Sequence, residues 1–116
     1  MIVFFYNGSE GAAMKISSSQ RAYLRGLAHD LEPIFRIGKE AVPPEFVKAI
    51  DEALEKRELI KISVLKNCDE SVRELAEITS ERTRSLVVFV IGRRFVLYRP
   101  SKDPKIELPK KAKKDA

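Results

Sequence analysis

The sequence predicts one domain of the α/β (α+β) class, with three helices and a four-stranded mixed sheet in the order α-β-α-β-α-β-β. The 116-residue chain is 44% hydrophobic and 34% charged, which suffices for one packed core and a solvated surface. Three segments repeat apolar residues at helical spacing, and an apolar run typical of a strand follows each of them. One more apolar run follows the last of these, and Gly92-Arg93 between them indicates a terminal hairpin.

The first helix is expected to begin at residues 17–20 and to end before Pro33, because helical geometry is disfavoured for the residue that precedes a proline. Ser17 and Gln20 have the spacing of a capping box, in which the two side chains bond to backbone donors at a helix start. Gly26 costs this helix about 1 kcal/mol relative to alanine, and a close approach of helix and sheet would explain it. The apolar face repeats at Leu24, Leu27, Ala28 and Leu31.

A short strand is expected over residues 34–37, where an apolar run ends at Gly38. The second helix is expected over residues 44–57, since Pro43-Pro44 suits a helix entrance, whose N–H groups have no intrahelical partner. Its inward positions are Phe46, Val47, Ile50, Ala53 and Leu54.

The second strand is expected over residues 60–64, where apolar residues alternate with Lys61 and Ser63. This alternation predicts that one face of the strand is solvated. A third helix is expected to follow and to end at about Thr83.

The last two strands form the expected hairpin. Residues 86–91 are an uninterrupted β-branched and aromatic run, which is typical of a strand buried on both faces. Gly92-Arg93 suits a two-residue II′ turn, with glycine at positive φ, and residues 95–98 return as the last strand. Strands separated by helices are expected to pair in parallel through right-handed crossovers.

The chain divides into an extension of doubtful origin (residues 1–14), one domain (15–109) and a basic tail (110–116). We expect the extension to reflect a start codon assigned in error upstream of Met14 or an expression remnant, and a short extra strand is the alternative. Residues 99–116 contain seven Lys or Arg against three Asp or Glu, so they carry +4 of the net charge of +5. Clustered positive charge attracts polyanions, most often nucleic acid, although a merely solubilising tail is the alternative.

The sequence offers little for catalysis or metal binding. Cys68 is the single cysteine and His29 the single histidine, which excludes an intramolecular disulfide and a two-histidine metal site. The carboxylates fall mostly on outward helix faces beside Lys or Arg. We therefore expect no enzyme activity, no metal, no cofactor and no small-molecule substrate. No apolar run approaches the roughly 18–20 residues that cross a bilayer, so no membrane association is expected.

The connection between the first strand and the second helix is the most informative segment. A glycine-led loop that enters a helix presents backbone N–H groups, which can bind phosphate, and Lys39 adds a positive charge. Glu40 and the missing N–H groups of Pro43 and Pro44 oppose this interpretation, and an ordinary β–α turn is the alternative.

Four segments occur with a characteristic order and spacing: QRAYLRGLAH (20–29), PIFRIGK (33–39), ALEKRELIKI (53–62) and VIGRRFVLYRPSKDPKIELP (90–109). Together they resemble the YhbY-type CRM domain (chloroplast RNA splicing and ribosome maturation), over residues 15–109. The resemblance implies a fold similar to the C-terminal domain of translation initiation factor three. It also implies RNA binding, in bacteria to precursors of the large ribosomal subunit.

The RNA-contact loop of this family is a Gly-x-x-Gly motif, similar to the loop with which KH domains clamp backbone nucleotides. The matching residues are Gly38, Lys39, Glu40 and Ala41. Ala41 departs from the motif, and alanine disfavours the positive φ or close phosphate approach that glycine permits.

We therefore expect a cytoplasmic, monomeric RNA-binding protein that assists ribosome assembly on large-subunit precursor RNA. Lys39 and the amides of residues 38–41 are expected to contact phosphates, which position a protein without reading sequence. The basic side chains expected to extend this contact are Arg21, Arg25, Arg36, Arg93, Arg94, Lys110 and Lys111. The alternatives are a module that docks on a ribosomal or translation protein through the solvated face of the second strand, and an enzyme that acts on RNA.

Overall fold

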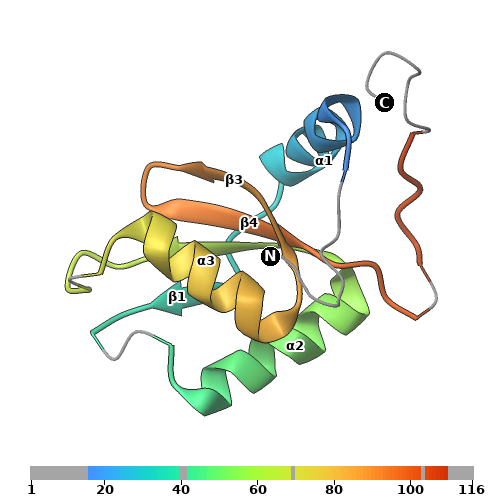
Figure 1. Cartoon of the computed structure of the whole chain (residues 1–116). Helices are drawn as coiled ribbons and strands as arrows, with labels where there is room; N and C mark the ends of the chain where they lie inside the picture. The colour runs from blue at the N-terminus through green and yellow to red at the C-terminus, as the bar shows by residue number, and fades with distance from the viewer. Residues whose placement is uncertain (1–15, 40–41, 69, 103, 110–116) are drawn as a thin grey trace.

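The computed structural model describes residues 16–39, 42–68, 70–102 and 104–109. The predicted extension (residues 1–14) and basic tail (110–116) lie outside the described residues. The three helices and four strands follow each other in the predicted order (Figure 1). They are α1 (Ser18–His29), β1 (Phe35–Ile37), α2 (Pro44–Arg57), β2 (Leu59–Val64), α3 (Val72–Thr83), β3 (Leu86–Ile91) and β4 (Arg94–Tyr98).

The four strands form one mixed sheet in the order β1-β2-β4-β3. The β1–β2 pair is parallel, as expected for strands joined through a helix, and β4 is antiparallel to both of its neighbours. The expected parallel pairing of β2 with β3 is wrong, because β4 lies between them. The strand β4, which forms the hairpin with β3, therefore lies beside β2. This places β3 at the edge of the sheet.

This strand order corrects two further expectations. The β3 strand was expected to be buried on both faces, but as an edge strand it buries Val88 and leaves Ile91 60% exposed. The β2 strand was expected to have one solvated face, but as a central strand it leaves Lys61 only 9% exposed and Ser63 half-buried.

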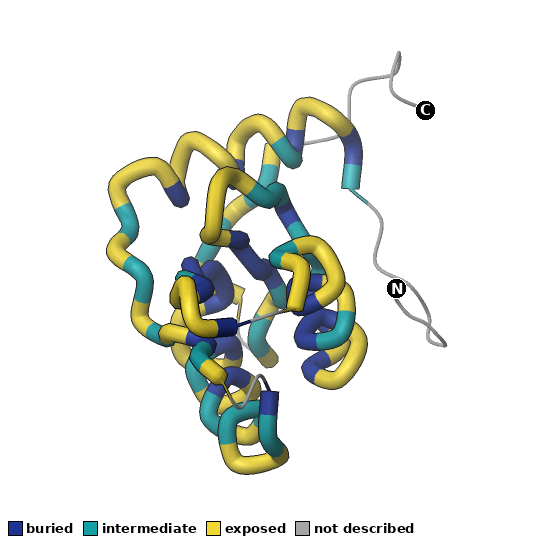
Figure 2. Tube along the Cα trace, turned by 90° about the vertical axis from the view of Figure 1, so that its left-hand side faces the viewer, coloured by how far each residue is buried: buried dark blue, intermediate teal, exposed yellow. Residues whose placement is uncertain are grey.

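The sheet is covered on both faces (Figure 1). Helices α2 and α3 pack on one face and α1 lies on the other, and the buried residues gather between these layers (Figure 2). The buried residues under α2 and α3 are Ile37, Val42, Ile50, Leu54, Ile60, Ile62, Val64, Cys68, Leu75, Ala76, Phe95 and Leu97. The buried residues under α1 are Leu24, Ala28, Leu59, Val88, Val96 and Tyr98.

The predicted capping box at the start of α1 is confirmed. The backbone N–H of Gln20 donates to Oγ of Ser17 at 3.1 Å, and the backbone N–H of Ser17 donates to Oε1 of Gln20 at 3.0 Å. The predicted reason for Gly26 is wrong, because a Cβ built there would meet nothing within 4 Å. Gly92 has φ +58 and Arg93 is not at positive φ, which fits the predicted II′ turn.

Glu58 fixes the C-terminal segment to the domain. This fully buried residue follows α2 with φ +67, a region that L-residues rarely adopt. Its carboxylate accepts backbone hydrogen bonds from Ser101, Lys105 and Ile106 at 2.8, 2.8 and 2.7 Å. Burial raises the pKa of Glu58, but these hydrogen bonds lower it by a larger amount. The net pKa of Glu58 therefore lies below the usual value. Burial and then the charge of Glu58 raise the pKa of Tyr98.

Among the residues that the structure describes, no helix is both long enough and apolar enough to span a bilayer.

Candidate nucleic-acid interface

Three connections meet at one end of the sheet: the β1–α2 loop, the β2–α3 loop and the β3–β4 turn. They lie at the left of Figure 1, and Figure 2 is a view from that side. The backbone N–H of Leu65 donates to the carbonyl oxygen of Ile37 at 2.8 Å. A Cβ built on Gly38 would lie 3.6 Å from both Oδ1 of Asn67 and Cδ1 of Leu65. The glycine that opens the predicted phosphate loop is therefore in contact with the β2–α3 loop.

Lys39 is exposed at this end, whereas the N-terminus of α2 has little capacity to bind an anion. Pro43 and Pro44 have no N–H, and the amides of Phe46 and Val47 both donate to the carbonyl oxygen of Pro43. An anion at this loop would thus depend on Lys39 and on the loop amides. Glu40 and Ala41 lie outside the described residues, so their role remains a prediction.

Arg36 and Arg94 lie in one row of the sheet, on the face that α1 covers in part. Both are paired with Ser63, Arg36 from β1 and Arg94 from β4. Neighbouring strands are about 4.8 Å apart, so the backbones of the two arginines are about 10 Å apart. Both side chains are exposed, and the row ends at the β3 edge with Ile91. The structure therefore brings two of the predicted arginines together.

Arg93 lies at the same end but has a different environment from Arg94. Its Nε donates to the carbonyl oxygen of Val64 at 3.0 Å, and its Nη2 donates to that of Leu65 at 2.6 Å. These two hydrogen bonds tie the β3–β4 turn to the end of β2. Arg93 thus holds the β3–β4 turn against the end of β2. Its remaining guanidinium N–H donors are available to a ligand.

A groove of mixed apolar and basic character lies between the β2–α3 loop and the β3–β4 turn. It is lined by Ser63, Val64, Leu65, Lys66, Ile91, Gly92, Arg93 and Arg94. All of its charged lining residues are cations, and Leu65 and Ile91 are 40% and 60% exposed. Leu65, Lys66 and Ile91 were not among the predicted RNA-binding residues, and Lys66 was expected only on the outward face of the second strand. The sequence around them does not indicate that two segments distant in the chain form one groove.

The two predicted arginines of α1 differ from each other as well. Nη1 of Arg21 donates to the carbonyl oxygen of Val87 at 2.8 Å and to that of Val88, beside the irregularity in the β3–β4 pairing. Burial lowers the pKa of Arg21. Arg25 is exposed, and its guanidinium lies 5.1 Å from the centre of the Phe89 ring. Arg21 therefore supports the sheet edge, whereas Arg25 can contribute to a basic surface.

Arg25 and the row of Arg36 and Arg94 share one side of the sheet. Phe89 pairs with Val96, which packs under α1, and Arg94 precedes Val96 by two residues on the same strand. Lys39 lies at the adjoining end of β1. We name the exposed cations Arg25, Arg36, Lys39, Lys66 and Arg94 the basic surface. The predicted Lys110 and Lys111 lie outside the described residues.

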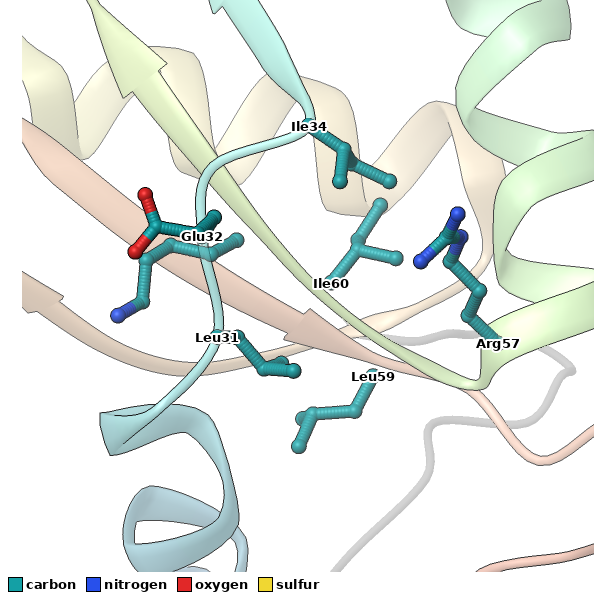
Figure 3. Close-up of a pocket in the computed structure, with 7 residues that line it drawn as sticks. Leu31, Glu32, Ile34, Arg57, Leu59 and Ile60 are labelled. Atoms are coloured by element: carbon teal, nitrogen blue, oxygen red, sulfur yellow. The ribbon is translucent and has the colours of Figure 1, made fainter.

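A second hollow, of about 120 Å³, lies at the opposite end of β1 and β2 (Figure 3). It is lined by Leu31, Glu32, Ile34, Arg57, Leu59, Ile60 and Lys61. Glu32 and Arg57 lie on opposite sides of Ile60 in this view, so the charges do not converge on one point. With an acid among its lining residues, this hollow is less suited to a polyanion than the groove.

The single histidine and the single cysteine lie apart from the basic surface. His29 is exposed at the last residue of α1, and Cys68 is buried in the core under α2 and α3. No three His, Cys, Asp or Glu side chains within the described ranges are grouped so that they could hold a metal ion.

Comparisons with known proteins are consistent with this geometry. A model of the CRS1 / YhbY (CRM) domain family matches residues 16–99. The chain is 48% identical over 95 residues to the "Probable RNA-binding protein YqeI" of Bacillus subtilis, across 81% of this chain and 99% of that relative. It is 35% identical over 96 residues to an RNA-binding protein of Haemophilus influenzae, across 83% of this chain and 97% of the relative.

The fold is also found among solved structures. The solution structure of the hypothetical protein SAV1595 from Staphylococcus aureus has a TM-score of 0.70 and 51% sequence identity. The match covers 82% of this chain and 100% of that one. It confirms the predicted fold class of three helices on a four-stranded mixed sheet.

Proposed function

The chain belongs to the CRS1 / YhbY (CRM) domain family, and from this premise we propose that it binds RNA and assists assembly of the large ribosomal subunit. The observation that carries RNA binding is the basic surface, in which cations from one helix, two strands and two loops gather at one end and one side of the sheet. Two relatives are themselves named RNA-binding proteins. The assignment to large-subunit precursor RNA rests on the resemblance of the sequence to the family.

In this proposal, affinity comes mainly from phosphate contacts. Arg36 and Arg94 are about 10 Å apart on rigid strands, which allows them to contact phosphates that are not adjacent. Lys39 is exposed just beyond the end of β1, at the predicted Gly38–Ala41 loop. Each neutralised phosphate releases counterions, so binding weakens steeply with salt. The protein acts as a monomer in the cytoplasm and needs no cofactor.

The predicted alternative is a protein that docks on a solvated face of β2, and the strand does not present such a face. The strand is central, Lys61 is buried, and Ser63 is half-buried between two arginines. An enzyme acting on RNA has no supporting observation among the described residues, because His29 is exposed at the end of α1 and Cys68 is buried in the core on the other side of the sheet. RNA binding is therefore the function that the geometry supports best.

Sequencing of RNA cross-linked to the protein in growing cells tests the proposal. We expect enrichment of large-subunit precursor RNA over messenger and transfer RNA, and loss of this enrichment in a variant that carries Arg36→Glu and Arg94→Glu. Enrichment of messenger or transfer RNA instead would contradict the ribosomal assignment and retain RNA binding. Cross-linking that is equal in wild type and variant would remove the basic surface from the proposal.

A further inference from the structure

We propose that the groove between the β2–α3 loop and the β3–β4 turn holds the bases of unpaired RNA nucleotides. This inference rests on the proposed RNA binding and adds the class of RNA: a single-stranded segment whose bases reach the groove while its phosphates contact the basic surface.

Two large apolar side chains of the groove are exposed to solvent. Ile91 is 60% exposed and Leu65 is 40% exposed, and both line the groove. Ile91 is also the most exposed of the large hydrophobic side chains in the described part of the chain. Apolar surface in water is costly, and the faces of nucleobases are apolar surfaces that can cover it. Phosphates alone would leave these two side chains in water.

The charge of the groove identifies the occupant. Lys66, Arg93 and Arg94 line it, and no acidic side chain does. The cations continue beyond the groove to Arg36 and Lys39, so the positive charge forms a track rather than a point. A nucleotide chain repeats one negative charge and one apolar base in every unit, which matches a track of cations beside an apolar groove.

The position of the apolar side chains favours unpaired over duplex RNA. In an A-form duplex the bases are stacked in the interior, and the major groove is too deep and narrow for side chains to enter. Leu65 and Ile91 could then contact only ribose and phosphate. A splayed single strand can turn its bases toward the same two side chains.

The test compares two probes on the full chain: an oligoadenylate of about 12 nucleotides and a base-free polyphosphate of similar charge. The variant Ile91→Thr keeps the β-branched shape and removes apolar surface at the groove. The matched control is Ile34→Thr, since Ile34 is 38% exposed at the other end of β1. Melting curves verify that both variants fold.

We expect Ile91→Thr to weaken oligoadenylate binding about fivefold, in line with about 1 kcal/mol, and to leave polyphosphate binding and the salt dependence unchanged. Ile34→Thr is expected to change neither affinity. Equal oligoadenylate affinity for wild type and Ile91→Thr would overturn this inference but not the proposed RNA binding. The same holds if Ile91→Thr weakens the binding of oligoadenylate and of polyphosphate equally. Tighter binding of an acidic, leucine-rich peptide than of oligoadenylate would assign the groove to a protein partner. A wild-type chain that binds no RNA would instead overturn the proposed function.

Discussion

The guanidinium of Arg93 donates to the carbonyl oxygen of Leu65 at 2.6 Å, and this contact joins the β3–β4 turn to the loop that follows β2. The same side chain bonds to the carbonyl of Val64, while its neighbour Arg94 extends from β4 beside Ser63. Two adjacent arginines thus differ in their surroundings: Arg93 shapes the groove, and Arg94 is exposed toward solvent.

Substituting these two arginines separates the two roles. Arg93→Ala is expected to lower the free energy of unfolding by about 1 kcal/mol, because it removes two hydrogen bonds. Arg94→Ala is expected to change stability by less than about 0.5 kcal/mol and to reduce the slope of log K against log [salt] by about 0.7–0.9. Urea denaturation and RNA titrations at several salt concentrations measure these effects. Equal destabilisation by both substitutions would contradict the distinction.

Reversing the charge of Lys39 tests the predicted phosphate loop. Lys39 is exposed, so Lys39→Glu is expected to leave the melting temperature nearly unchanged. Affinity for structured RNA is expected to fall about tenfold or more, because a phosphate contact is replaced by repulsion. Lys56→Glu, an exposed lysine at the far end of α2, is the matched control and is expected to have a smaller effect. Unchanged affinity in Lys39→Glu would remove the loop from the interface.

Local features of this fold could be predicted from the sequence because neighbouring residues determine them. The Ser17–Gln20 capping box and the positive φ of Gly92 are examples of such short-range chemistry. The position of β4 between β2 and β3 could not be predicted, because it depends on pairing between strands that are far apart in the chain. The groove has the same origin, since Leu65 and Ile91 are distant in the chain.

Glu58 shows a further limit of sequence interpretation. It stands in a run of charged residues at the end of α2, where an exposed side chain is the normal expectation. The structure buries it completely, because amides more than forty residues later in the chain donate to its carboxylate. Nothing in the sequence around Glu58 indicates that pairing.

Replacing Glu58 tests how the C-terminal segment is held. In Glu58→Gln, one carboxylate oxygen becomes an NH2 group that faces backbone N–H donors, so these donors no longer have an acceptor. We expect the free energy of unfolding at neutral pH to fall by about 2 kcal/mol. Chemical denaturation measures this decrease, and cleavage by trypsin after Lys105, in the segment that Glu58 holds, is expected to become faster. A variant as stable as wild type would show that the segment is held by other contacts.

The pH dependence of stability follows from the same carboxylate. The pKa of Glu58 is lower in the folded than in the unfolded chain, so the folded state favours the ionised form. The stabilisation is therefore present above the unfolded pKa and is lost as the pH falls through the folded pKa. We expect wild type to lose more stability than Glu58→Gln as the pH falls below the ordinary glutamate pKa of about 4.3. Parallel stability curves for the two proteins would contradict this assignment.

The basic tail is tested by deleting residues 110–116, which contain four lysines and one aspartate. If the lysines bind phosphates, the deletion is expected to reduce the slope of log K against log [salt] by about 0.7–0.9 for each phosphate that is no longer neutralised. The melting temperature is expected to change little, because the hydrogen bonds to Glu58 come from residues 101–106, which the deletion retains. A deletion that lowers solubility but leaves the slope unchanged would support the solubilising alternative. Removing the tail from the Arg94→Ala variant then completes the comparison: additive decreases of the slope indicate that tail and sheet bind different phosphates of the same RNA.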